Sequence, residues 1–474
     1  MPDDTGSPLA ALPRAAAQAE AFRRRIDEGP QRAEDDYHAS LARFDEPLPE
    51  GGRPATEVID QLVARATPGL QKSAGRRFFG WVIGNSHPVG VAADWLASAW
   101  GQNAGNPVAS PAAAACEAVA AQWLLELLDL PREASVGFVT GATMANFVGL
   151  AAARSAVLAR VGWDVQAQGL FGAPPIQVLI GDDAHATVYS ALQYLGLGHA
   201  RVTRIATDAR GAIDPAAFAQ AVTHITGPAI VILQAGQINT GACDDFARLV
   251  PLAQARGAWV HVDGAFGLWA RTSREHAACV AGIEQADSWA TDGHKWLQTP
   301  YDCGYAIVRD ARAHWDAMSI NASYLPVGQG ERDPSHYVPE LSRRARGFAT
   351  WAMIAHLGRR GIGALVEQHV RVARLMAARL AQAPGVEVVN TVVLNQLIVR
   401  FGTDRPADEA DRLTRATIAR LQADGEAFAG GAQWRGRWVM RISVIGSETH
   451  EAEGERSAQA ILAAWRQVRA QPSA

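Results

Sequence analysis

The chain has 474 residues, of which 48% are hydrophobic and 19% charged, so disorder over most of its length is excluded. It carries 44 basic and 48 acidic side chains, a formal charge of −4, which gives no general attraction to nucleic acid. The first ten residues lack a basic segment with an apolar core, and no apolar run reaches the roughly 18 residues that span a membrane. We expect a cytoplasmic protein of two or three domains, with neither nucleic acid nor a membrane as partner.

The N-terminal part, which we take as residues 1–90, is predicted to be a helical arm. Apolar residues recur at helical spacing between Leu9 and Ile26, and the pattern breaks at Gly51-Gly52 and Pro54.

Residues 91–350 are predicted to form a large α/β domain. Apolar, strand-like runs alternate there with amphipathic helical patterns, which is typical of a mostly parallel sheet covered by helices on both faces. Ligands of such sheets bind at the carboxyl ends of the strands. The expected strands are 136–140, 177–180, 201–205, 229–233, 259–262, 288–291 and 305–308, and the expected helices between them are 144–158, 187–195, 215–222 and 245–256.

Residues 351–474 are predicted to form a smaller α+β domain. A long helix is expected over 351–380 and another over 409–423, with strands at 386–389, 396–401 and 437–444. The four cysteines have neither CxxC nor Cys/His spacing, so we expect no metal site and no disulfide framework; they are Cys116, Cys243, Cys279 and Cys303.

Lysine is scarce in this chain: of the 44 basic residues 42 are arginine, and only Lys72 and Lys295 are lysine. A guanidinium stays protonated, whereas a primary amine can lose its proton and condense with an aldehyde. Lys72 lies in a polar stretch, and we interpret it as an ordinary surface residue. Lys295 follows a predicted buried strand and stands between His294 and Trp296, surroundings that favour the neutral, nucleophilic amine.

Three further loops are expected at the same edge of the sheet. Asp263 ends the strand in WVHVDGAF, where its carboxylate could face a protonated ring nitrogen or simply cap a turn. Thr143 lies in a strand-turn-helix segment whose free N–H groups could bind phosphate, although threonine is also a common N-cap. His185 could stack on a planar ring, relay a proton or be structural. Together with Lys295, these groups are what pyridoxal 5'-phosphate needs.

From about residue 55 to 465 the chain resembles the group II pyridoxal-phosphate amino-acid decarboxylases, which include the aromatic L-amino-acid and glutamate enzymes. The motifs that carry the resemblance are GHKWLQTPYDCG, HVDGAFG, TGATMAN, Ala109-Ser-Pro111 and Ser342-Arg-Arg-Ala-Arg346. The resemblance implies the aspartate-aminotransferase fold, type I, and a homodimer with active sites at the subunit interface. It implies that Lys295 forms the internal aldimine, Asp263 faces the ring nitrogen, His185 stacks on the ring, Ala265 packs on its other face, Ala142 and Thr143 cup the phosphate, and Asp292 or His294 contacts that phosphate.

The chain departs from the family pattern in three places. The loop 325–341 contains a single tyrosine, Tyr337, about three positions later than the family's proton-donating tyrosine. Where relatives often read GTT, this chain reads GQINTG, so a hydroxyl there is either missing or supplied by Thr240. The segment 78–88 resembles the substrate-side segment, which makes Trp81 and His87 candidate substrate contacts in place of other residue types.

The resemblance implies decarboxylation of an L-amino acid, aromatic or otherwise bulky, to the amine and CO2 through an external aldimine. Other reactions of the same cofactor remain alternatives: transamination, retro-aldol cleavage or oxidative deamination. A transaminase would need an arginine for the substrate carboxylate, and Arg441 is a candidate, although decarboxylases can carry one there too. A non-catalytic homologue is the third possibility.

Overall fold

Two compact units make up this chain, for which the computed structural model describes residues 7–319 and 331–470. One unit takes Met1–Trp81, Leu375–Val388 and Val399–Ala474, and the other takes Val82–Arg374 and Val389–Ile398. This division differs from the consecutive segments 1–90, 91–350 and 351–474 that the sequence suggested. The N-terminal segment groups with C-terminal elements, and the long helix that begins near residue 350 stays with the larger unit as far as Arg374. A pattern along the chain locates an element but does not show which distant element packs against it.

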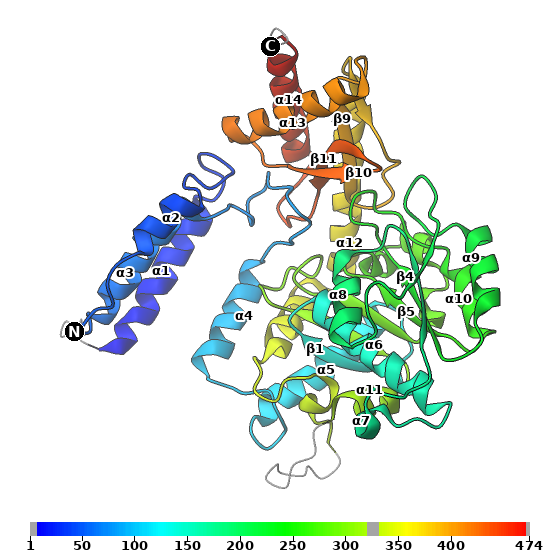
Figure 1. Cartoon of the computed structure of the whole chain (residues 1–474). Coiled ribbons are helices and arrows are strands. Elements are labelled where there is room, and N and C mark those ends of the chain that lie inside the picture. Colours follow the sequence, from blue (N-terminus) through cyan, green and yellow to red (C-terminus); the bar gives the residue numbers. More distant parts are fainter. Residues whose placement is uncertain (1–6, 320–330, 471–474) are drawn as a thin grey trace. The chain divides into compact units, whose positions relative to one another are not determined.

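The larger unit contains a seven-stranded sheet with the strand order β1-β7-β6-β5-β4-β2-β3 (Figure 1). The neighbours from β3 to β6 run parallel, whereas β7 runs antiparallel to both β1 and β6. The mostly parallel seven-stranded sheet is therefore confirmed, and the carboxyl ends of β1, β2, β4, β5 and β6 share one edge. The strands are β1 Ser135–Val139, β2 Gln177–Gly181, β3 Thr203–Ile205, β4 Ala229–Gln234, β5 Trp259–Asp263, β6 Ser288–Asp292 and β7 Gly304–Val308.

Helix α6, Ala142–Ala159, lies against this sheet and contacts β5, β6 and β7. Among the described residues it alone is long and apolar enough to cross a membrane, but 67% of it is buried within the fold, as in the core helix of a globular unit. The other helices of this unit are α4 Pro88–Ala99, α5 Pro111–Leu127, α7 Val165–Gln168, α8 Ala186–Tyr194, α9 Pro215–Ala221, α10 Phe246–Gln254 and α11 Ala311–Met318.

Helix α12, Arg346–Leu380, is interrupted at Gly358, whose φ of 61° and ψ of 173° are not helical. The sequence predicted one continuous helix here, because the glycines at 358, 361 and 363 do not by themselves show where the backbone leaves the helix. Glycine adopts a positive φ without steric cost, since it has no Cβ atom.

The smaller unit combines helices with a four-stranded sheet of order β10-β11-β9-β8. Strand β10 was not expected, because Gly430 and Gly431 at its start have no strand preference. The elements are α1 Ala11–Arg24, α2 Tyr37–Phe44, α3 Ala55–Ala66, β8 Val386–Val388, β9 Gln396–Phe401 (which begins in the larger unit), α13 Ala407–Asp424, β10 Gly430–Trp434, β11 Arg437–Ser443 and α14 Glu451–Ala470.

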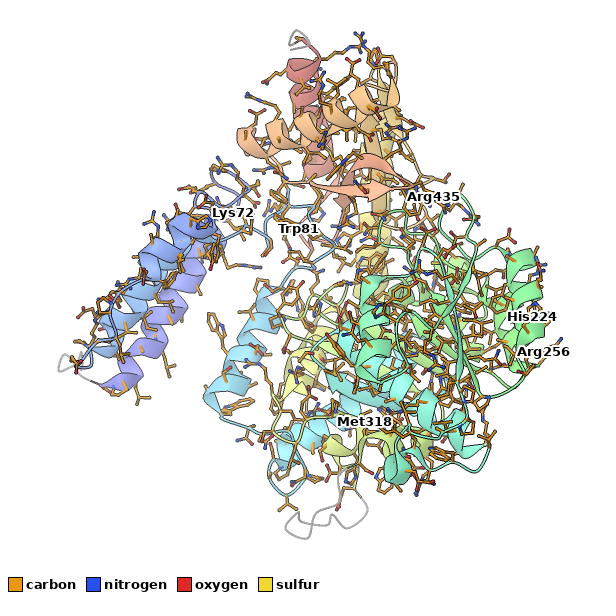
Figure 2. All side chains as sticks on the ribbon, viewed as in Figure 1. Lys72, Trp81, His224, Arg256, Met318 and Arg435 are labelled. Carbon is orange, nitrogen blue, oxygen red and sulfur yellow. The ribbon has the colours of Figure 1, made fainter. Side chains whose placement is uncertain are left out.

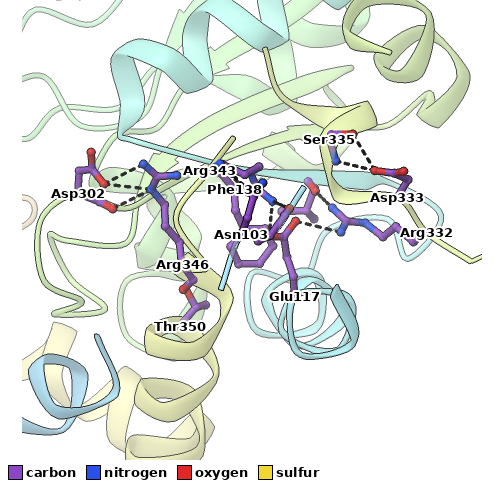
Figure 3. Close-up of polar contacts among 12 residues, drawn as sticks. Asn103, Glu117, Phe138, Asp302, Arg332, Asp333, Ser335, Arg343, Arg346 and Thr350 are labelled. Carbon is purple, nitrogen blue, oxygen red and sulfur yellow. Dashed lines mark hydrogen bonds and ion pairs between the residues drawn. The ribbon is translucent and has the colours of Figure 1, made fainter. Parts of the chain in front are cut away.

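A buried carboxylate on α5, Glu117, binds two arginines that follow residue 330 (Figure 3). Its oxygens lie 2.8 Å from Nη1 of Arg343 and 3.0 Å from Nη1 of Arg332, and the side chains of Glu117 and Arg343 are both 0% exposed. Arg343 also donates to the carbonyl of Phe138, 2.7 Å away, and Arg332 donates to that of Val136. The cluster therefore fixes this segment to β1, the strand that leads into α6.

A second buried cluster joins α6 to the middle of the sheet. His261 on β5 is fully buried; its Nδ1 is 2.8 Å from the hydroxyl of Ser288 on β6, and its Nε2 is 2.9 Å from Oδ1 of Asn146 on α6. The indole N–H of Trp259 donates to the same hydroxyl. Because the Ser288 oxygen accepts from Trp259, its own proton is donated to Nδ1 of His261. The ring proton is therefore assigned to Nε2, which donates to Asn146. Burial lowers the pKa of His261 to about 3, so the ring is neutral at physiological pH.

The replacement Glu117→Gln is expected to lower the free energy of unfolding by about 3 kcal/mol, because it leaves the buried guanidinium of Arg343 without a counter-charge. Urea unfolding followed by tryptophan fluorescence measures this loss. Glu126→Gln on the same helix is the matched control: its partner Arg359 is exposed, so a loss below about 1 kcal/mol is expected. Equal losses for the two variants would contradict the importance of burial.

The replacement His261→Gln is expected to flatten the dependence of stability on pH between about pH 6 and pH 4. Folded His261 stays neutral down to about pH 3, whereas the unfolded imidazole takes a proton near pH 6.5. The wild type therefore loses up to about 1.4 kcal/mol per pH unit as the pH falls through this window. Unfolding midpoints across the pH range measure the slope; the exposed His199→Gln should keep the wild-type slope. An unchanged slope in His261→Gln would refute the assignment.

Candidate active site

The amine of Lys295 lies at the carboxyl edge of the sheet, three residues after the end of β6. Its Nζ atom is 2.8 Å from Oδ2 of Asp292, and the lysine side chain is 16% exposed. The centroid of the Phe266 ring is 5.9 Å from Nζ. The amine is thus held by a carboxylate and an aromatic ring while part of its side chain stays open to an incoming aldehyde.

The second oxygen of Asp292 connects Lys295 to the start of α6. Oδ1 accepts the N–H of Ala142 at 2.6 Å and lies 3.4 Å from Nε2 of His294. Nδ1 of His294 accepts the N–H of Cys303, and burial lowers the pKa of this histidine. Asp292, His294, Lys295 and Ala142, all predicted site residues, are therefore brought together.

Two glycines allow this close approach. A Cβ atom on Gly141, the N-cap of α6, would lie 3.1 Å from Cε1 of His294 and 3.2 Å from Oδ1 of Asp292. A Cβ atom on Gly304, the first residue of β7, would lie 2.5 Å from the Cα of Gly141. Thr143 in the first turn of α6 is exposed, so its hydroxyl and the helix N-terminus are accessible to an anion.

Asp263 ends β5 at the same edge and is 5% exposed. Its Oδ1 accepts the N–H of Ala265 at 3.1 Å, and the carbonyl of Ala265 accepts the N–H of Asp292 at 3.0 Å. A single short turn after β5 therefore links the carboxylate predicted to face the ring nitrogen with the end of β6, which leads to Lys295.

His185 is the N-cap of α8 and lines a small cavity together with Asp263. Its Nδ1 is 2.8 Å from the Thr187 hydroxyl and accepts the N–H of Thr187 at 3.3 Å, which fixes the orientation of the imidazole. The structure therefore brings these two predicted residues to one place.

One acidic residue of this cavity, Asp244, was not among the predicted site residues. Asp244 is 4% exposed and follows the loop after β4, where it reads as an ordinary turn aspartate. Burial raises its pKa to about 6. Two adjacent aspartates after a turn, Asp244 and Asp245, were the available signal. Thr240, which we had considered as a substitute hydroxyl donor, is 1% exposed and donates instead to the carbonyl of Arg210.

The three candidate substrate residues lie in different units. His87 belongs to the larger unit, where it caps α4 and lies beside the ring of His356, with centroids 4.9 Å apart. Trp81 and Arg441 belong to the smaller unit (Trp81 is labelled in Figure 2). Trp81 packs on Phe428 and is 45% exposed, and burial lowers the pKa of Arg441 on β11. Their contact with substrate stays a prediction.

Tyr337 lies against β1. Its ring meets His314 of α11 edge-on, with centroids 5.2 Å apart, and the guanidinium of Arg332 stands 4.7 Å above it. Its carbonyl accepts a hydrogen bond from Nε2 of His314. Among the described residues, these ring contacts and this hydrogen bond do not join Tyr337 to Lys295, Asp263 or His185. Of the loop 325–341 that contains Tyr337, residues 325–330 lie outside the described residues.

Comparison with known proteins agrees with this geometry. Residues 38–401 match the family model described as the pyridoxal-dependent decarboxylase conserved domain. An aromatic-L-amino-acid decarboxylase of Bacillus atrophaeus is 28% identical over 421 residues, 87% of this chain and 85% of the relative. A phenylacetaldehyde synthase of Arabidopsis thaliana is 25% identical over 412 residues, 83% of each chain.

Solved structures show the same fold. The crystal structure of Oryza sativa TDC with PLP and tryptamine has a TM-score of 0.90 at 23% identity, over 98% of this chain and 99% of that chain. The expected type I fold is thereby confirmed, with its large mixed sheet and its smaller antiparallel sheet. Because the family match extends over most of the chain, the protein belongs to the pyridoxal-dependent decarboxylases, and pyridoxal phosphate is its cofactor.

Proposed function

We propose that this protein decarboxylates an aromatic or other bulky L-amino acid to the corresponding amine and CO2, as a homodimer. The observation that carries the proposal is the meeting of the Lys295 amine with the N-terminus of α6 through Asp292. Family membership supports the reaction, and the similarity to an aromatic-L-amino-acid decarboxylase supports the substrate class.

The residues at the sheet edge fit pyridoxal phosphate. Asp292 accepts the N–H of Ala142 at the start of α6, while the N-cap Gly141 has no side chain and Thr143 in the first turn is exposed, so Thr143 and the remaining N–H groups of this turn suit a phosphate group. Asp263 supplies a buried carboxylate for the ring nitrogen, and His185 supplies a flat ring of fixed orientation. Lys295 supplies the primary amine.

When bound, the cofactor supplies an aldehyde that condenses with amines and a ring that accepts the electron pair left by departing CO2. Lys295 provides the amine that holds the cofactor until the substrate amine replaces it. The buried carboxylate of Asp263 would favour a proton on the ring nitrogen, because an opposite charge close by in a low-dielectric site stabilises the charged form. His185, whose imidazole is oriented by Thr187, would stack on the ring and hold it in place.

Oxidative deamination is a second candidate, favoured by the packing of Tyr337. A decarboxylase must protonate the carbanion after CO2 leaves, and the family pattern assigns this step to a tyrosine hydroxyl. In this chain the tyrosine of that loop is Tyr337, about three positions later, and its ring packs on His314. With dioxygen and water, the same amino acid would instead give the aldehyde, CO2, ammonia and hydrogen peroxide. The similarity to a phenylacetaldehyde synthase is compatible with this outcome.

The homodimer is supported by apolar side chains that the single chain leaves exposed. Helices α1, α2 and α3 contain no buried residue, so their apolar faces have no core of their own. The exposed apolar residues on and beside them are Leu9, Leu12, Tyr37, Leu41, Phe44, Leu48, Val58 and Leu62. A second copy of the chain that covers these faces would complete the fold.

Borohydride reduction is expected to attach the cofactor to Lys295, because reduction converts its reversible bond with an aldehyde into a stable amine. The chain has only two lysines, so peptide mass spectrometry gives an unambiguous answer. Lys295→Arg keeps the positive charge beside Asp292 but cannot be trapped, and CO2 release should fall at least a thousandfold. Lys72→Arg is the matched control and should be trapped like the wild type.

The same preparation, screened against the twenty amino acids and their hydroxylated relatives, separates the candidate reactions. Equal amounts of amine and CO2 from an aromatic substrate would support decarboxylation. Aldehyde, ammonia and peroxide would support oxidative deamination, and a keto acid would support transamination. A trapped cofactor without CO2 from any amino acid would refute the decarboxylase proposal.

Sedimentation equilibrium is expected to give twice the chain mass at micromolar concentration. The paired replacement Leu12→Asp and Leu62→Asp, on α1 and α3, should shift the equilibrium toward the single chain, because it places two charges on the apolar face. Leu252→Asp, at an exposed leucine on α10, is the control and should leave the mass unchanged. A single-chain mass for the wild type would refute the homodimer.

A further inference from the structure

The cavity beside His185 is walled by two buried carboxylates. Asp244 and Asp263 are 4% and 5% exposed, and both line this cavity at the carboxyl ends of β2, β4 and β5. The cavity measures about 10 Å³, room for about one water molecule, so the two side chains lie close to the same small space. The proposed mechanism uses only one of them.

Asp244 is bound rigidly to the backbone next to Asp263. Its Oδ1 accepts the N–H of Ile213 and its Oδ2 accepts the N–H of Gln234, both at 2.7 Å. The N–H of Asp244 in turn donates to the carbonyl of Gln234 at 3.0 Å. Gln234 is the residue directly opposite Asp263 in the pairing of β4 with β5. The Asp244 carboxylate therefore holds the strand end that stands beside Asp263.

Its oxygens meet backbone N–H groups and, among the described residues, no arginine or lysine in an ion pair. Burial raises the pKa of Asp244 to about 6, against the stabilising effect of the two backbone N–H groups. The charge of Asp208, on the loop before α9, raises it further. The titratable or charged groups around it are Asp208 and its partner Arg210 on that loop, His185 at the start of α8, Asp263 on β5, and Cys243 next to it in the chain. A cation would therefore stabilise the ionised form.

We propose that Asp244 is a second carboxylate of the cofactor's ring-nitrogen site, which positions the end of β4 beside Asp263 and, when ionised, strengthens binding of the protonated ring. The inference rests on the cofactor site of the proposed function, and not on which amino acid is the substrate. Asp263 remains the direct partner of the ring nitrogen, and Asp244 adds a second negative charge beside the shared cavity.

Coupling between two sites is reciprocal, which makes the inference measurable. If the bound cation favours the ionised form of Asp244, then ionisation of Asp244 must favour binding by the same factor. Affinity that depends on Asp244 should therefore be present above pH 6 and disappear as the pH falls below it. An opposite charge close to a carboxyl group commonly shifts its pKa by one unit or more, which corresponds to about tenfold in affinity.

The experiment measures the dissociation constant of pyridoxamine 5'-phosphate for the full-length chain freed of its cofactor. This probe has the ring and the phosphate but no aldehyde, so the bond to Lys295 plays no part. For Asp244→Asn, the ratio of its dissociation constant to that of the wild type is expected to be about 10 at pH 8 and to approach 1 at pH 5. Taking the ratio cancels the titration of the probe's own phosphate.

Two further variants make the test decisive. Asp245→Asn, at the next residue, keeps the cap of α10 and should give a ratio near 1 at every pH. Asp244→Glu keeps the charge and should retain the wild-type pH dependence, even if its affinity is lower, and it decides the question if Asp244→Asn does not fold. A ratio for Asp244→Asn that is constant with pH, or a flat pH dependence in Asp244→Glu, would overturn the proposal. Absence of CO2 release would refute only the reaction, because the binding measurement does not depend on it.

Discussion

One carboxylate, that of Asp292, holds together the two positive ends that meet at the sheet edge. It accepts the first N–H of α6 with one oxygen and contacts the amine of Lys295 with the other. The aligned peptides of a helix place about half a positive charge at its N-terminus, and the single negative charge of this carboxylate offsets that charge while it also attracts the amine of Lys295. The N-terminus of α6 and the lysine loop can therefore lie side by side in a buried region without repelling each other.

Two buried clusters stabilise the strands that lead to this edge, one through an ion pair and the other through neutral hydrogen bonds. Glu117 and Arg343 remain charged and compensate each other, and they fix the segment after residue 330 to β1. His261 avoids charge altogether and connects α6, β5 and β6 through neutral hydrogen bonds. Between them, the strands that end in Asp263 and Asp292 have little freedom to slide relative to α6.

Much of this edge could be predicted from sequence because its signals are local. Buried parallel strands read as apolar runs, and the rarity of lysine singled out Lys295 without any structure. Asp244 was missed because a carboxylate after a turn looks the same whether it caps a helix or faces a cavity; only the approach of Ile213 and Gln234 distinguishes the two. The packing of Tyr337 on His314 joins segments 23 residues apart, and the grouping of the N-terminal helices with C-terminal strands joins still more distant ones. No periodicity records such pairings.

The contact between Gly141 and Gly304 limits how this protein can diversify. A side chain at Gly304 would meet the main chain of Gly141 and would have to force apart β7 and the turn before α6, whereas a side chain at Gly141 would press on His294 and Asp292. Larger residues at this junction are therefore expected to disturb the fold, so a change of substrate would have to come from residues elsewhere in the site. The backbone crowding at Gly304 thus restricts side-chain size at the end of the site that holds Lys295.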